Sequence, residues 1–264
     1  MNPETVAFID SGVGGLPYLA HARSALSGRR FVYLADREHF PYGERDRESI
    51  IQSTISVTDR LIAREHPRLI VVACNTMSVV ALPALRARFA LPFVGVVPAV
   101  KPAASLSRRR RVGVLATRQT VEGDYLRGLI EHYAIGCSVV SLSSAALVDF
   151  VERDLYKAGP EAREERVRQE VGRFLTEDID ALVLGCTHFL HLEAEFRRLL
   201  DAKGILLVDS RDGVTRQAAR LLAPAAPGHA ADDVGSLYVT GPRPLEESYG
   251  WFARGFGLRL ADAL

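Results

Sequence analysis

The chain has 264 residues, of which 48% are hydrophobic and 25% charged, as in an ordinary globular protein. Its 33 basic and 32 acidic residues leave a net charge of +1, which excludes bulk electrostatic attraction to nucleic acid or to an anionic membrane. The uncharged stretch 69–85 is interrupted by Asn75, Thr76 and Pro83, so it is not a membrane span. The length fits one large α/β domain or two smaller ones.

Short apolar runs rich in β-branched residues recur along the chain and predict buried parallel strands. The predicted strands are residues 6–9, 31–34, 69–73, 93–97, 112–116, 181–184 and 205–208. Amphipathic helical patterns lie between them, in 82–89, in 189–199 and in 161–175 behind Pro160. This alternation predicts an α/β fold with mostly parallel sheets.

Two segments between these elements are predicted to be irregular. Residues 224–236, rich in Ala, Pro, Gly and Asp, are expected to form a surface loop. The basic run 108–111 precedes a predicted strand and is expected to be a solvated loop, with an acidic partner as the alternative.

Two segments of the chain resemble each other. Residues 68–76 (RLIVVACNT) and 180–188 (DALVLGCTH) both run from an apolar strand into a cysteine that small polar residues follow. A fainter similarity pairs residues 6–11 with 112–117. We interpret the chain as two related α/β halves that arose by duplication.

Cys74 and Cys186, the cysteines of this repeat, each stand where a predicted strand ends and a helix begins. Ligands bind at that edge of α/β sheets, and a helix N-terminus there favours an anion such as a thiolate. Such a setting lowers the pKa of a thiol from about 8.5 toward neutrality. Structural packing is the alternative for each, and it is the interpretation for Cys137, which lies in a segment, 134–139, without a charged residue.

A glycine-rich turn, DSGVGG, follows the first predicted strand and precedes a helix that begins near Pro17. Its glycines allow the backbone to approach a ligand carboxylate or phosphate closely. The turn is not a dinucleotide fingerprint, because Pro17 occupies the third glycine position, and the chain has no Gly-Lys pair for a P-loop. Asp10 places a carboxylate at this strand tip.

His188 follows Cys186 by two residues, where an imidazole can accept the proton of the thiol and return it. A helix cap is the alternative role for His188. A metal is not expected, because no second ligand pair is spaced to complete a tetrahedral site. The lysines, at positions 101, 157 and 203, lie in no phosphate-binding context, which argues against pyridoxal phosphate. We therefore expect neither a metal nor a cofactor.

Two thiols from two related halves suggest one type of reaction. Inverting a stereocentre needs one group that removes a proton from carbon and a second that returns a proton to the opposite face. Cysteine serves as the base when ionised and as the acid when protonated.

The sequence resembles the cofactor-independent glutamate racemases of bacteria, through motifs that span nearly the whole chain in the same order. The matching segments are 8–16 (FIDSGVGGL), 33–36 (YLAD), 41–43 (PYG), 73–76 (ACNT), 95–101 (GVVPAVK), 112–117 (VGVLAT) with Thr120, 184–188 (LGCTH), 207–210 (LVDS) and 238–241 (YVTG). Two departures are Phe189-Leu190 in place of Tyr-Pro and residues 143–146 (SSAA) where a Cys-Pro pair is common.

The resemblance implies two pseudo-symmetric α/β domains with an active site in the cleft between them. Residues 1–97 with 208–264 form the first expected domain and 98–207 the second, and we expect Leu206–Val208 to rejoin the first half. The resemblance also implies that Cys74 and Cys186 are the acid–base residues, that Asp10 assists Cys74, and that Glu152 with His188 assists Cys186. The implied substrate contacts are Asp10, Ser11, Tyr42, Gly43, Asn75, Thr76, Thr117, Thr120, Thr187 and His188.

The implied function is racemisation of glutamate, which supplies D-glutamate for peptidoglycan synthesis. The alternatives on this scaffold are an aspartate, other amino-acid or hydantoin racemase or a maleate isomerase, and, in a different class, a non-catalytic ligand-binding protein. Three cysteines without a pairing pattern and a start without signal-peptide features predict a cytoplasmic protein. We expect it to be a homodimer.

Overall fold

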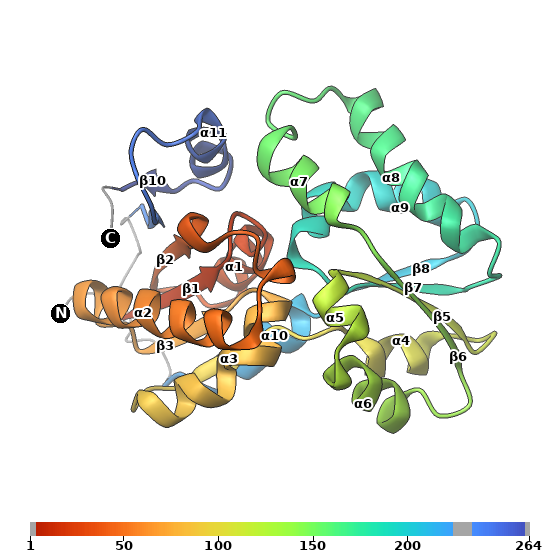
Figure 1. Ribbon diagram of the computed structural model, residues 1–264, viewed down its shortest axis with the longest axis horizontal. Helices are drawn as coiled ribbons and strands as arrows, with labels where there is room; N and C mark the ends of the chain where they lie inside the picture. Colours follow the sequence, from red (N-terminus) through yellow and green to blue (C-terminus); the bar gives the residue numbers. More distant parts are fainter. Residues whose placement is uncertain (1–3, 224–233, 262–264) are drawn as a thin grey trace. The chain divides into compact units, whose positions relative to one another are not determined.

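The computed structural model describes residues 4–223 and 234–261. They divide into two compact units: the first runs to Val96 and resumes at Arg211, and the second is Val97–Ser210. Each unit has a parallel sheet with helices packed on it, the α/β architecture that the sequence predicts (Figure 1). Of the predicted loop 224–236, residues 224–233 lie outside the described residues.

Six parallel strands in the order β10-β9-β2-β1-β3-β4 form the sheet of the first unit. They are β1 (Thr5–Asp10), β2 (Arg30–Ala35), β3 (Leu69–Val72), β4 (Phe93–Gly95), β9 (Ser236–Val239) and β10 (Arg259–Leu260). Every residue of β1 and β3 is buried, which explains their continuous apolar sequences.

Helices α2 (Arg47–Glu65) and α3 (Asn75–Arg88) run side by side over one face of this sheet (Figure 1). Their apolar residues form one core with alternate residues of the strands, such as Ile9. Helices α1 (Leu16–Ala25) and α10 (Arg211–Leu221) pack against each other, and α10 contacts β3 and β4. The remaining elements are the 3-10 helices η1 (Arg37–His39) and η2 (Tyr42–Glu44) and helix α11 (Glu247–Gly255).

Four parallel strands in the order β6-β5-β7-β8 form the sheet of the second unit. They are β5 (Arg111–Ala116), β6 (Ser138–Ser143), β7 (Ala181–Leu184) and β8 (Leu206–Val208). The helices of this unit are α4 (Val100–Leu106), α5 (Arg118–Glu122), α6 (Asp124–Tyr133), α7 (Ala145–Arg153), α8 (Pro160–Leu175), α9 (Glu193–Asp201) and the 3-10 helix η3 (Thr187–Leu192).

The strand order of the second sheet repeats that of four strands in the first. In each case the first strand of the unit is flanked by the second and the third, and the fourth lies outside the third. The equivalent pairs are β1 with β5, β2 with β6, β3 with β7, and β4 with β8. This correspondence supports the interpretation of the chain as a duplicated α/β unit.

One prediction about the second half is wrong. Leu206–Val208 does not rejoin the first half but forms β8, which pairs with β7 from Ala181↔Leu206 to Val183↔Val208. The prediction for Cys137 is confirmed: the side chain is partly buried and packs against the core of the second sheet. The basic run is exposed from Arg108 to Arg110, but Arg111 already belongs to β5.

Candidate active site

In the first unit, Asp10 and Cys74 lie at the carboxyl ends of two neighbouring strands. Asp10 is the last residue of β1, and Cys74 follows the end of β3 by two positions. Cys74 is the N-cap of α3, and its Sγ accepts a hydrogen bond from the Met77 N–H at 3.5 Å. A helix N-terminus and an N–H donor both stabilise negative charge on a neighbouring atom.

A short hydrogen-bonded series links the Cys74 thiol to the Asp10 carboxylate. The thiol donates to Ser11 Oγ at 3.8 Å, and the Ser11 hydroxyl donates to Asp10 Oδ1 at 3.2 Å. Asp10 Oδ1 also accepts the Gly12 N–H at 2.9 Å. All three side chains are buried, so little water screens the charge of the Asp10 carboxylate from the Cys74 thiol.

The phenol of Tyr33 holds the glycine-rich turn in place. Its hydroxyl accepts the Gly15 N–H and donates to the Gly12 carbonyl, each at 2.9 Å. A Cβ at Gly15 would lie 2.5 Å from Ala73 Cβ, so only glycine fits where the turn packs on the residue before Cys74. Tyr33 is not among the predicted site residues, because nothing local in the sequence distinguishes it from a core aromatic.

Asn75, the first residue of α3, is buried with its amide unsatisfied. Its side chain is 3% exposed, and neither Oδ1 nor Nδ2 has a hydrogen-bond partner among the described residues. An orphaned buried amide is costly, so such a group is typical of a site that a polar ligand completes. Thr76, the next residue, is also buried.

Tyr42 and Gly43 lie in η2, which contacts α3. The Tyr42 hydroxyl donates to Asp36 Oδ2 at 2.5 Å, and Tyr42 belongs to the same buried core as Cys74. Burial, then the charge of Asp36 and the hydrogen bond to it, raise the pKa of Tyr42, and the charge of Cys74 adds to this rise. Tyr42 is therefore a neutral phenol at every physiological pH.

Cys186 in the second unit repeats the placement of Cys74. It follows the end of β7 by two positions and is the N-cap of η3. Its backbone is extended, with φ −134° and ψ 134°, against −127° and 126° at Cys74. The expected helix start after Cys186 is confirmed, but its first turns are 3-10 rather than α-helical.

Cys186 forms the end of a buried Cys–His–Glu series. Its Sγ lies 3.7 Å from His188 Nδ1, and His188 Nε2 lies 2.7 Å from Glu152 Oε1 on α7. Burial lowers the pKa of His188, but the hydrogen bonds to Cys186 and Glu152, and then their charges, outweigh it and raise that pKa well above 6.5. These contacts therefore favour the protonated form of the imidazole.

The remaining predicted residues of the second unit lie beside these strand ends. Thr117 directly follows β5, caps α5, and its Oγ1 lies 3.0 Å from that of Thr120. Thr187, next to Cys186, is buried in η3. Each unit therefore brings its own predicted residues together at the carboxyl ends of its strands, and their roles stay predictions.

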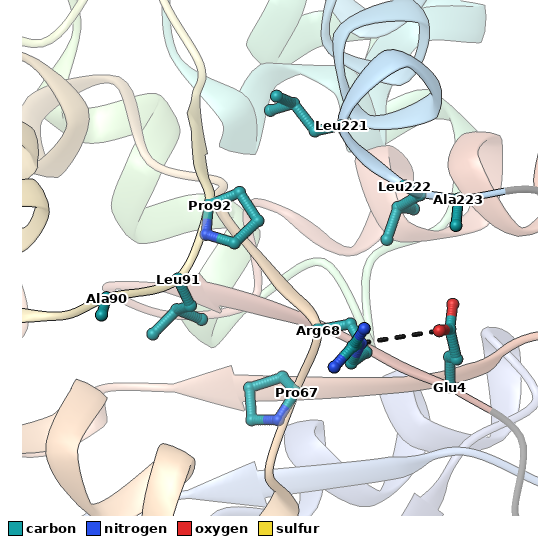
Figure 2. Close-up of a pocket in the computed structure, with 9 residues that line it drawn as sticks. All are labelled: Glu4, Pro67, Arg68, Ala90, Leu91, Pro92, Leu221, Leu222 and Ala223. Carbon is teal, nitrogen blue, oxygen red and sulfur yellow. Dashed lines mark ion pairs between the residues drawn. The ribbon is translucent and has the colours of Figure 1, made fainter.

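A pocket of about 430 Å³ in the first unit lies away from these residues. Figure 2 shows its lining side chains, among them Pro92 and the ion pair of Arg68 with Glu4. Glu4, Arg68 and Pro92 directly precede β1, β3 and β4. The pocket is therefore at the amino ends of the strands, opposite the edge that carries Asp10 and Cys74.

The described residues contain no group of three or more His, Cys, Asp or Glu side chains that could hold a metal ion. No helix within them combines the length and the apolar composition needed to cross a membrane.

The chain is similar to known racemases over most of its length. The model of the family Asp/Glu/Hydantoin racemase matches residues 15–218. The glutamate racemase of Shewanella sp. (strain MR-4) is 40% identical over 220 residues, which cover 83% of this chain and 80% of the relative. That of Treponema pallidum (strain Nichols) is 38% identical over 262 residues, 98% of this chain and 96% of the relative.

A solved structure agrees with these matches. The structure of Escherichia coli glutamate racemase in complex with L-glutamate and the activator UDP-MurNAc-ala has a TM-score of 0.89 at 36% identity and covers 98% of this chain and 97% of that one. The chain therefore belongs to the Asp/Glu/Hydantoin racemase family and is an isomerase that acts on amino acids. Within that family, glutamate racemase is the function that these relatives support.

Proposed function

We propose that this racemase interconverts L- and D-glutamate with Cys74 and Cys186 as the two acid–base residues and without a cofactor. The observation that carries the proposal is the equivalence of the two cysteines. Each is a buried thiol two positions beyond an equivalent strand, occupies the N-cap position of a helix with an extended backbone, and has a polar partner that leads to a carboxylate. Glutamate is proposed as the substrate because the relatives are glutamate racemases.

The proposed reaction has two proton transfers. The thiolate of one cysteine takes the proton from Cα of glutamate, which leaves the electron pair of the C–H bond on carbon. The thiol of the other cysteine donates its proton to the opposite face of that carbon, so the configuration inverts. After one turnover the protonation states of the two sulfurs are exchanged, and the enzyme is ready for the reverse reaction.

The negative charge that develops next to the α-carboxylate needs stabilisation, because no cofactor delocalises it. Backbone N–H groups at the starts of α3 and η3 and in the turn after Asp10 are suitable donors for a carboxylate. The unsatisfied amide of Asn75 fits the same task, since it offers both a donor and an acceptor.

The partners of the two thiols differ and suggest different assistance. Ser11 and Asp10 form the relay for Cys74, whereas the His188 cation and Glu152 support Cys186 as a thiolate–imidazolium pair. The further proposed substrate contacts are Tyr42, Gly43, Thr76, Thr117, Thr120 and Thr187.

We also propose that the product D-glutamate supplies peptidoglycan synthesis and that the enzyme is a cytoplasmic homodimer. Dimers are the commonest oligomers of soluble enzymes. Sedimentation equilibrium of the purified chain tests the dimer: a mass of two chains supports it, and a mass of one chain contradicts it.

A second candidate is another racemase of the same family, because the family description includes aspartate and hydantoins. These activities are separated by a polarimetric panel of D- and L-glutamate, D- and L-aspartate and hydantoins. We expect kcat/KM to be highest for glutamate; a higher value for aspartate or a hydantoin would contradict the substrate assignment.

The two-cysteine mechanism is tested with Cys74→Ser and Cys186→Ser, with Cys137→Ser as the matched control. Each of the first two variants removes one acid–base group, so we expect racemisation to fall by roughly 10² to 10⁴. Cys137→Ser should keep wild-type activity, because this side chain packs against the core of the second sheet. Racemisation at the wild-type rate by either of the first two variants would refute the proposal.

A further inference from the structure

Asp36 is a buried carboxylate that the proposed reaction does not use. It directly follows β2, is 1% exposed, and receives hydrogen bonds from side chains of separate segments. The Tyr42 hydroxyl donates to Oδ2 at 2.5 Å, and the Thr240 hydroxyl donates to Oδ1 at 2.6 Å. His39 Nδ1 lies 2.9 Å from both carboxylate oxygens.

These contacts tie the loop after β2 to the end of β9. Thr240 directly follows β9, and its backbone N–H donates to the Ala35 carbonyl at 3.1 Å. The Thr240 hydroxyl also accepts the Glu38 N–H at 3.0 Å, so it bridges the loop and Asp36. The segment that returns to the first unit at Arg211 thus contributes a group to the network around Tyr42.

The network is also joined to the strand that carries Asp10. The Asp36 N–H donates to the Asp10 carbonyl at 2.8 Å, and Ala35 pairs with Asp10 in the sheet. Tyr42 in turn belongs to the same buried core as Cys74, and η2 contacts the helix that Cys74 precedes. Asp36 therefore connects two parts of the site: its carboxylate holds the loop that carries Tyr42 and Gly43, and its backbone N–H is bonded to the Asp10 carbonyl.

We propose that Asp36, held by Thr240, is a positioning residue that fixes the Tyr42–Gly43 segment beside Cys74 for substrate binding. This inference rests on the proposed function, in which Gly43 and Cys74 meet the same substrate. Asp36 itself touches no reacting atom in this account. Its carboxylate orders the segment before the substrate arrives, which lowers the entropy cost of binding.

The first test compares two tyrosine variants that lose the same kind of interaction. Tyr42→Phe removes a hydroxyl that donates to Asp36, and Tyr238→Phe removes one that donates to the buried carboxylate of Glu65 in the same unit. We expect both to lower the unfolding temperature, but only Tyr42→Phe to raise KM and lower kcat/KM, by about ten- to one-hundredfold for both enantiomers. Asp36→Asn should match Tyr42→Phe, and the double variant should be no worse than the more impaired single one.

The second test uses a conservative rescue at Thr240. Thr240→Val removes the hydroxyl at nearly constant volume, whereas Thr240→Ser keeps it, so we expect a raised KM for valine and near wild-type kinetics for serine. If Asp36→Asn does not fold, these two Thr240 variants still test whether the network around Asp36 positions the Tyr42–Gly43 segment. The inference is wrong if Tyr42→Phe and Thr240→Val change only the unfolding temperature, as Tyr238→Phe does. Such a result leaves the two-cysteine mechanism standing, since that depends on the cysteine variants.

Discussion

Replacing Glu152 by glutamine keeps the size of the side chain and removes the charge that faces His188. Oε1 of Glu152 lies 2.7 Å from Nε2 of His188, and both residues are buried, so the contact is a charge-assisted hydrogen bond with little solvent screening. The loss of such a bond costs about 2 kcal/mol, which is roughly thirtyfold in a rate or equilibrium constant. We expect racemisation to slow by that factor, because the imidazolium that supports the Cys186 thiolate is disfavoured.

The same substitution changes how stability depends on pH. Contacts with Cys186 and Glu152 raise the pKa of His188 in the folded state above 6.5. A raised pKa contributes stability that is fully present below pH 6.5 and is lost as pH rises through the folded value. Because Glu152→Gln lowers that folded pKa, the stability difference between wild type and variant should be largest between about pH 5.5 and 6.5 and shrink at higher pH.

Urea denaturation of both proteins from about pH 5.5 to 9, together with racemisation rates at each pH, measures these two effects. Arg153→Gln, next to Glu152 but on the exposed side of α7, is a matched control that should leave both unchanged. A pH-independent stability difference, with racemisation within about twofold of wild type, would refute the reasoning about the Cys186 partners.

Three further substitutions test the first unit. Asn75→Leu should raise KM while leaving stability equal or higher, because the amide has no partner among the described residues; kinetics and urea denaturation check both. Tyr33→Phe removes the hydroxyl that bonds the Gly15 N–H and the Gly12 carbonyl, so it should lower the free energy of unfolding by about 1–3 kcal/mol. An unchanged urea midpoint would contradict this. Gly15→Ala places a Cβ 2.5 Å from Ala73 Cβ and should lower both melting temperature and activity, whereas wild-type values for both would show that the turn can shift.

The buried parallel strands could be predicted from sequence because strands covered on both faces are continuously apolar. β6 was not predicted, because it is an edge strand in which half of the residues are serine and no position is fully buried. β9 was not predicted, because it directly follows the Ala/Pro/Gly-rich segment, and its first residue was included in the predicted loop 224–236. The placement of Leu206–Val208 depends on a long-range pairing with β7, which no local pattern encodes.

The two cysteines could be selected from sequence because the strand-then-cysteine pattern occurs twice, whereas Cys137 occurs in no repeat. The partners of these thiols were accessible only through the family resemblance or the fold. Glu152 is 36 residues from His188, and Asp36 meets Thr240 across 204 residues, so neither contact leaves a local signal. One local feature of Asp36 did resemble a site residue: it directly follows the end of β2, as Asp10 is the last residue of β1.

The central claim is that one thiolate removes the proton from Cα and a different thiol donates a proton to the opposite face. It is tested most directly by measuring the hydrogen isotope at Cα of substrate and product at early conversion in D₂O. Starting from L-glutamate or from D-glutamate, the account predicts that the newly formed enantiomer carries solvent deuterium at Cα while the remaining substrate keeps its protium. Protium transferred from substrate into product would show that a single group removes and returns the proton, and would contradict the account.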